Sequence, residues 1–309
     1  MTPRVVRAAA AALCATIVVA ASMAGATTGE LVTFPSLDID PETGVAIQLT
    51  GLFFTPDPSA GGFPAVIALH GCDGMYSTLA SRRDKLTARH QAMADLLVAE
   101  GYAVLFPDSF NPRGRREVCT QPARDQTITQ ANRRLDVFGA LEYLRSRPDI
   151  ATNRVALLGW SHGGSAVLTS MNAREKSVAA YLRALGDPAE FFLTAIALYP
   201  GCYASLLGKD GYAPAAPVSV FIGEADDWTS PKPCIALGNA MAAKRLPLHV
   251  HAYPDTYHGF DTPNLPRPRH LDVPNGVHPG QGVTIAANAA ARDDAYARIK
   301  AQLRAVLMP

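Results

Sequence analysis

The chain is poor in charge of either sign and has no cluster of basic residues. Only 18% of its 309 residues are charged, with Lys+Arg 28 against Asp+Glu 27, whereas 48% are hydrophobic. A chain of this composition can bury a large core, which excludes an intrinsically disordered or fibrous protein. Binding a polyanion requires clustered Lys and Arg, so nucleic acid is not expected as a partner.

Long apolar runs are missing everywhere except at the N-terminus. There, Arg4 and Arg7 precede the uncharged run Ala8–Ala21, and the small residues Ala24–Ala26 follow. This order is typical of a secretory signal peptide, and the run is shorter than the ~20 residues of a membrane span. We therefore expect residues 1–26 to be removed, and the mature protein to be exported, periplasmic or extracellular, with no stable membrane anchor.

Cysteine is scarce, with five in the chain. Cys14 lies within the N-terminal apolar run, so cleavage would leave Cys72, Cys119, Cys202 and Cys234. An even number in an oxidising compartment predicts two disulfides, and four cysteines allow three pairings. The sequence has no Cys-x-x-Cys and no neighbouring His pair at ligand spacing, so we expect no metal site.

Short runs rich in Val, Ile and Leu alternate with helical patterns from about residue 64 to the end. Unbroken apolar runs indicate strands covered on both faces, and their alternation with helices predicts an α/β fold with a mostly parallel central sheet and helices on both faces. We expect one such domain over residues 27–309. The predicted strands are 65–69, 103–106, 155–158, 195–199, 218–222 and 248–253, and the predicted helices lie near 87–99, 127–146, 162–172, 233–244 and 285–307. An antiparallel edge hairpin of 31–34 and 45–54 and two long loops over the carboxyl edge of the sheet, 203–217 and 261–282, complete the prediction.

A short glycine-rich motif, Gly159-Trp160-Ser161-His162-Gly163, joins an expected strand to an expected helix. In that context G-x-S-x-G is a nucleophile elbow, whose sharp turn exposes the serine hydroxyl while the glycines let strand and helix approach closely. An ordinary Gly-rich turn is the alternative interpretation. Ser161 is therefore the candidate nucleophile.

A serine hydroxyl needs a general base, oriented by an acid, to act as a nucleophile at neutral pH, and this type of fold orders them Ser, Asp, His. His258 follows the last expected strand, and Asp226 and Asp227 follow the strand before it. We favour Asp226 over Asp227; adjacent side chains on a loop point in different directions, so only one of them can support the imidazole. The alternative is that either aspartate merely caps the helix that follows. Asp255 and Asp261 are weaker candidates, since they flank the base itself.

The first buried strand ends in His70-Gly71-Cys72, where acyl transfer would need donors for a developing oxyanion. Gly71 permits a close backbone approach, so the N–H of Cys72 would join the N–H of His162 in stabilising that charge. A tight turn without this role is the simpler interpretation.

In this order the motifs resemble those of the dienelactone hydrolase family of the α/β-hydrolase fold, over about residues 45–306. The resemblance implies Ser161, Asp226 and His258 as the catalytic triad. The namesake enzymes carry cysteine at the elbow and glutamate after the third strand, where this chain has Ser161 and His70. A secreted serine esterase is therefore the better inference than an enzyme for dienelactone itself. The motifs are His70-Gly71-Cys72, Pro107-Asp108-Ser109-Phe110, Gly159-Trp160-Ser161-His162-Gly163, Gly223-Glu224-Ala225-Asp226-Asp227-Trp228 and His258-Gly259-Phe260.

The resemblance also bears on substrate contacts and disulfides. His70, Arg113 and Arg115 become candidates for substrate contact, the arginines as ligands of a carboxylate, with solvated loop arginines as the alternative. In this fold Cys72 and Cys119 both follow strand ends that neighbour each other. Cys202 and Cys234 flank the loop that carries Asp226. The implied disulfides are Cys72–Cys119 and Cys202–Cys234.

The sequence therefore predicts a hydrolase that cleaves a small-molecule ester or lactone by acyl transfer, without a metal or organic cofactor. Cleavage of an amide or thioester is one alternative, because a triad alone does not select the bond. A ligand-binding protein that keeps the hydrolase fold without turnover is another, although such a protein has no reason to retain all three triad residues.

Overall fold

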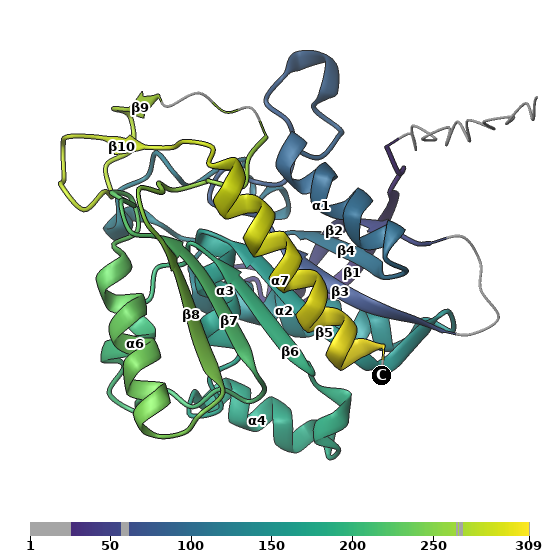
Figure 1. Cartoon of the computed structure of the whole chain (residues 1–309). Helices are drawn as coiled ribbons and strands as arrows, with labels where there is room; N and C mark the ends of the chain where they lie inside the picture. Colours follow the sequence, from purple (N-terminus) through teal and green to yellow (C-terminus); the bar gives the residue numbers. More distant parts are fainter. Residues whose placement is uncertain (1–25, 57–61, 264, 266–267, 309) are drawn as a thin grey trace, which may run out of the picture.

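An eight-stranded sheet forms the centre of the protein in the computed structural model, which describes residues 26–56, 62–263, 265 and 268–308 (Figure 1). The strand order is β1-β2-β4-β3-β5-β6-β7-β8, with β2 antiparallel to both β1 and β4 and the other pairs parallel. This confirms the α/β class, the mostly parallel sheet and the edge hairpin. The strands are β1 (Glu30–Ile39), β2 (Ala46–Phe54), β3 (Phe63–Leu69), β4 (Ala103–Asp108), β5 (Ile150–Trp160), β6 (Thr194–Leu198), β7 (Val218–Gly223) and β8 (Leu248–Tyr253).

The burial of each strand follows from its composition. Every residue of β3, β4, β6 and β7 is buried, as expected for continuous apolar runs with helices on both sides. By contrast, β1 alternates exposed and buried positions along most of its length, because only one face of this edge strand meets the core. The carboxyl ends of the parallel strands all lie at one edge of the sheet, where the loops carrying the candidate residues begin.

Helices cover both faces of the sheet, with α1 and α7 on one side and α2 and α3 on the other (Figure 1). Local sequence marks where they start: Thr129 and Asn132 form a reciprocal capping box at the start of α2, and Asn288 caps α7. The helices are α1 (Ala88–Ala99), α2 (Gln130–Arg145), α3 (His162–Ser170), α4 (Lys176–Leu185), α5 (Tyr203–Leu207), α6 (Pro231–Ala243) and α7 (Ala289–Leu307). Short 3-10 turns occupy Ala80–Arg82, Asn111–Arg113, Ala123–Asp125 and Pro188–Glu190.

One helix and two expected loops differ from the sequence-based expectation. The sequence did not predict α4, and Glu175 at its start makes no side-chain capping bond that would have marked it. The expected loop 203–217 begins with α5, and the expected loop 261–282 contains β9 (Arg269–His270), which pairs with β10 (Val283–Thr284). Both segments therefore carry more regular structure than a loop.

Two disulfides, Cys72–Cys119 and Cys202–Cys234, confirm the expected pairing, with Cα atoms 4.9 and 5.0 Å apart. The first belongs to a small apolar cluster outside the main core, together with Phe110. The second joins the residue before α5 to the first turn of α6. Both therefore brace loops at the carboxyl edge of the sheet.

The expected signal peptide falls outside the described residues, except for Ala26. Within the part that the structure describes, no helix combines the length and apolar character of a membrane span.

Candidate active site

Ser161 stands at the sharp turn between β5 and α3, at the carboxyl end of a central strand. Its backbone has φ 52° and ψ −116°, a strained combination for a residue with a side chain. The turn leaves no space on the flanking glycines: a Cβ on Gly163 would lie 2.2 Å from the Leu69 carbonyl oxygen, and one on Gly159 would lie 2.6 Å from the Gly163 carbonyl oxygen. Close backbone approach, rather than flexibility, thus explains the glycines of the elbow.

His258 connects this serine to a carboxylate. Its Nε2 lies 2.9 Å from Ser161 Oγ, and its Nδ1 lies 2.8 Å from Asp226 Oδ2. The serine is 9% exposed and the other two residues are 3% exposed. Because an ionised carboxylate can only accept, Nδ1 carries the proton and Nε2 is left to accept from the serine hydroxyl. This is the tautomer that a general base for serine requires.

The loop after β7 holds Asp226 by its own backbone. Oδ1 accepts the N–H groups of Trp228 and Thr229 at 2.9 and 2.8 Å, and Oδ2 accepts the Thr229 hydroxyl at 2.9 Å. Asp227 turns away from the base and accepts the N–H and hydroxyl of Thr284 at 2.7 and 2.9 Å. The structure therefore brings Asp226, and not its neighbour, to the histidine.

The two weaker acid candidates lie elsewhere. Asp255 is exposed, whereas Asp261 is fully buried and accepts from Trp160 Nε1 at 2.7 Å and from the Tyr199 hydroxyl at 2.6 Å. The Tyr199 ring packs beside the His258 ring, with centroids 4.5 Å apart. Asp261 thus anchors the loop that carries His258 to the ends of β5 and β6, and these hydrogen bonds do not involve the ring nitrogen atoms of His258.

Two backbone N–H groups were expected to form an oxyanion hole. Cys72 and His162 line one cavity together with Ser161. Within the described residues, no backbone carbonyl accepts from either N–H. Neither N–H is thus used by the backbone, and both residues lie beside Ser161.

A buried arginine lies behind His162. Arg133 is fully buried, and its Nη1 lies 3.0 Å from His162 Nδ1. Since a guanidinium can only donate, that nitrogen accepts and the imidazole is neutral. Burial, together with the charge of Arg133, lowers the pKa of His162 to about 3. Burial also lowers the pKa of Arg133 to about 10, which leaves it cationic at neutral pH.

The structure corrects the expected role of His70. Its ring is fully buried, with Nδ1 2.7 Å from the Gly71 carbonyl oxygen and Nε2 accepting the Ser109 N–H at 3.3 Å. Both ring nitrogen atoms are thus occupied by the backbone. His70 fixes the loop that presents Cys72, and it lines neither cavity beside Ser161.

The two candidate arginines are also placed away from the serine. Arg113 pairs with Asp136 at 2.8 Å and with Asp38 at 2.7 Å, and Arg115 is exposed. Neither lines the cavities beside Ser161, so the expected substrate contacts are not found there. The acidic partners of Arg113 come from α2 and β1, and no sequence pattern indicates that these two elements lie next to each other.

Two cavities meet at Ser161. One, of about 180 Å³, is lined also by His162 and Thr229, and we call it the oxyanion cavity. The other, of about 360 Å³, is lined also by His258 and Arg89, and we call it the His258 cavity. Among the described residues, no three His, Cys, Asp or Glu side chains form a group that could hold a metal ion.

Among the residues that surround Ser161, His258 and Asp226, Thr229 and Arg89 belong to no motif of the sequence. Thr229 contacts both the acid and the base, with its hydroxyl 3.2 Å from His258 Nδ1. Arg89 lines the His258 cavity from α1, with Nη2 3.4 Å from Asp73 Oδ2. Only Trp228 carried a signal, as the residue that follows two aspartates at a strand end; its ring lies 4.7 Å from that of His258.

Known proteins resemble this chain in sequence and in fold. The profile of the dienelactone hydrolase family matches residues 49–307, and a search of curated proteins gave no match. A solved dienelactone hydrolase-like promiscuous phosphotriesterase from metagenomic libraries has 16% identity and a TM-score of 0.62, covering 90% of this chain and 99% of that one. Esterase 2 of Thermogutta terrifontis, phosphorylated by paraoxon, has 14% identity and a TM-score of 0.59, covering 92% and 97%. These structures share the fold, and the profile, which spans the elbow and both partner residues, shows that the chain belongs to the dienelactone hydrolase family of hydrolases.

Proposed function

We propose that this protein is an exported serine hydrolase that cleaves small carboxylic esters or lactones through an acyl-enzyme. His258 Nε2 takes the hydroxyl proton as Ser161 Oγ attacks the carbonyl carbon, and Asp226 stabilises the imidazolium that forms. The imidazolium then protonates the leaving alkoxide oxygen. A water molecule, deprotonated by His258, attacks the acyl carbon; the bond to Ser161 Oγ then breaks, the imidazolium returns the proton to that oxygen, and the carboxylic acid is released.

One observation carries this proposal: the continuous hydrogen-bonded path from Ser161 Oγ through His258 to Asp226, with distances of 2.9 and 2.8 Å. Both distances lie within the range for proton transfer, without any movement of the chain. A ligand-binding protein would need neither the buried carboxylate nor the strained serine.

The oxyanion donors fit the same chemistry. The N–H groups of Cys72 and His162 belong to the backbone and are fixed from behind, the first by the disulfide to Cys119 and the second by Arg133. A donor fixed before the reaction needs no reorganisation as negative charge develops on the carbonyl oxygen, and one such donor contributes about 10²–10³ in kcat.

The two cavities accommodate the two parts of the ester substrate, the alcohol and the acyl group. The leaving alcohol must lie beside His258, which protonates it, so it occupies the His258 cavity of about 360 Å³. The acyl group stays bonded to Ser161 beside the oxyanion donors, so it occupies the oxyanion cavity of about 180 Å³. Export is supported by the two disulfides, which persist in oxidising compartments.

The test compares the mature wild type with Ser161→Ala on nitrophenyl acetate and butyrate, after circular dichroism shows that both are folded. Ser170→Ala is the matched control, because Ser170 is a fully buried serine at the end of the same helix. We expect Ser161→Ala to lose about 10⁴-fold or more in kcat and Ser170→Ala to stay within about threefold of the wild type.

A fluorophosphonate probe gives an independent readout, because one fold relative is an esterase phosphorylated by paraoxon. We expect the probe to label Ser161 in the wild type and in Ser170→Ala. No turnover of any ester and no labelling would favour a binding protein instead. Faster turnover of matched amides or thioesters than of esters would move the proposal to those bonds.

A further inference from the structure

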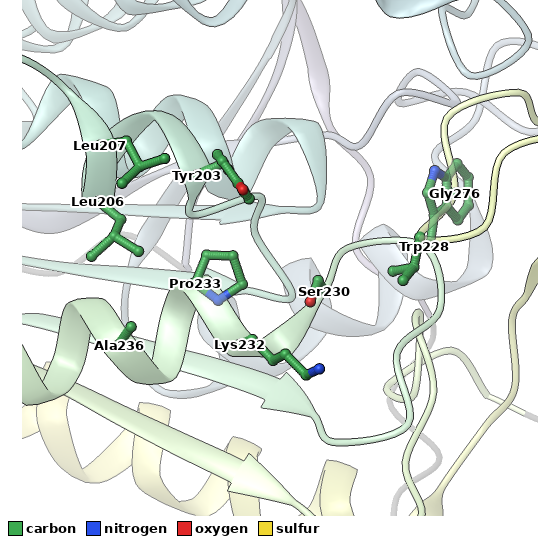
Figure 2. A pocket seen from close by; sticks show the side chains of 10 residues that line it. Tyr203, Leu206, Leu207, Trp228, Ser230, Lys232, Pro233, Ala236 and Gly276 are labelled. Carbon is green, nitrogen blue, oxygen red and sulfur yellow. The ribbon is translucent and has the colours of Figure 1, made fainter.

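An apolar groove of about 640 Å³ lies between α5, the first turns of α6 and the loop that follows Asn275 (Figure 2). Figure 2 shows the α5 side chains at one end and Trp228 beside Gly276 at the other. Lys232, the one charged side chain among the residues that line it, is exposed. We call it the distal groove; its apolar lining includes Tyr203, Leu206, Leu207, Pro233, Ala236 and Val277.

The distal groove continues the oxyanion cavity. Trp228 lines both and also lines the His258 cavity, so this residue alone does not assign the groove to either one; its ring lies 4.7 Å from that of His258. Three segments of the chain also pass from one cavity to the other, each lining the oxyanion cavity with one residue and the distal groove with a close neighbour. The pairs are Gly201 and Tyr203, Thr229 and Ser230, and Asn275 and Gly276.

The chemistry assigns this extension to the acyl side of the substrate. The leaving alcohol lies on the side of His258, and the oxyanion cavity is the one that His258 does not line. An acyl chain too long for about 180 Å³ must therefore leave the oxyanion cavity, and the segments around Trp228 lead it into the distal groove.

The walls of the distal groove are fixed. The disulfide Cys202–Cys234 joins the start of α5 to the first turn of α6, and both cysteines are buried. On the third wall, the Val277 N–H donates to the Asp227 carbonyl oxygen at 2.8 Å. A groove whose walls are already in place loses little conformational entropy when it binds a flexible chain.

We propose that the distal groove binds the alkyl part of the acyl group, so that the enzyme prefers esters of medium-chain carboxylic acids over acetates; this rests on the proposed function. Tyr203 is 65% exposed, Leu207 64% and Val277 41%, so a bound chain would remove apolar surface from water. Each methylene that becomes fully buried there raises kcat/KM by about fourfold.

The test measures kcat/KM for nitrophenyl acetate, butyrate, octanoate and decanoate, each below its micelle-forming concentration. In the wild type we expect the ratio of decanoate to acetate to exceed ten. Leu207→Gln, which makes the groove polar, and Ala236→Phe, which narrows it, should each lower this ratio at least tenfold. Ile235→Gln is the matched control: Ile235 is an exposed apolar residue of α6 that does not line the groove, so the ratio should match the wild type.

A ratio that is below one in the wild type, or that stays the same in Leu207→Gln and Ala236→Phe, would overturn the assignment. A second result would also overturn it: in a series of acetate esters, kcat/KM depends on the length of the alcohol, and Leu207→Gln and Ala236→Phe abolish that dependence. Turnover of acetate that requires Ser161 would still support the hydrolase in those cases, so failure of the groove and failure of the proposed function are distinguishable.

Discussion

Stability at mildly acidic pH tests whether three buried histidines are neutral. His70 and His90 are fully buried and His162 is 8% exposed. His70 Nε2 accepts from the Ser109 N–H and His162 Nδ1 accepts from Arg133, so a proton on either nitrogen would break that bond. Burial lowers the pKa of all three imidazoles well below 6.5, that of His162 to about 3.

The sign of the effect follows from proton uptake. An unfolded chain has histidines with pKa near 6.5, so it binds protons below that pH while the folded protein does not. The stability that these neutral rings provide is complete above about pH 6.5 and falls as the pH drops toward the folded pKa values. From pH 7 to pH 5, His162, with a folded pKa of about 3, should lower the free energy of unfolding by about 2 kcal/mol, within a total of about 5–15 kcal/mol, and His70 and His90 should lower it further in the same direction.

Urea unfolding at pH 7 and pH 5, with the disulfides intact, measures this loss. Glutamine does not titrate, so His90→Gln should lose less free energy of unfolding than the wild type between the two pH values. His278→Gln, at an exposed position, should follow the wild type. The comparison uses each protein's own value at pH 7, so the lower starting stability of His90→Gln cancels. Equal losses in the wild type and in His90→Gln would refute the reasoning.

Three further predictions concern the site. Asp226→Asn should lower kcat about 10⁴-fold, whereas Asp227→Asn, whose carboxylate does not touch the base, should lower it less than tenfold in the same ester assay. Arg133→Met should lower kcat about tenfold, yet keep the free energy of unfolding within about 1 kcal/mol, because Nε and Nη2 of the buried guanidinium have no hydrogen-bond partner among the described residues. A large loss of stability in urea would contradict this. Replacing Cys72 and Cys119 by serine should lower the free energy of unfolding by about 4 kcal/mol, since the disulfide closes a loop of 47 residues. The same replacement should lower kcat, because it loosens the proposed oxyanion donor at Cys72. An unchanged kcat would show that the disulfide does not position that donor.

Much of the fold was predictable because its determinants are local. Each central strand is a short apolar run, and the observed β8, Leu248–Tyr253, has the expected bounds. Ser161 was predictable because its turn requires glycines on both sides, and the order of serine, acid and base along the chain then selects the strand ends that supply the partners. The divergence of neighbouring side chains indicates only that one of Asp226 and Asp227 can reach the histidine; the family resemblance supported the choice of Asp226.

The failures share a physical cause. The local sequence around an arginine beside a strand end does not distinguish an arginine that faces a ligand from one that pairs with a carboxylate inside the protein. Arg113 pairs with Asp38 and Asp136, which are 75 and 23 residues away along the chain, so no local sequence pattern predicts these ion pairs. Arg133 is the reverse case: it looks like an ordinary helical cation, yet tertiary packing buries it fully against the elbow.

Local sequence and long-range packing also contribute differently to the chemistry of this site and to its specificity. The reacting groups lie at the carboxyl ends of single strands, so each is fixed by a few adjacent residues. The proposed acyl path, in contrast, is lined by three segments that are distant in sequence, around Gly201, Trp228 and Asn275, and a disulfide joins two of its walls. A substitution in any of these segments can alter which acyl chain fits while the distances from Ser161 to His258 and Asp226 stay the same. Selection for a new substrate would therefore act on this path first, and the reacting groups would remain recognisable from sequence.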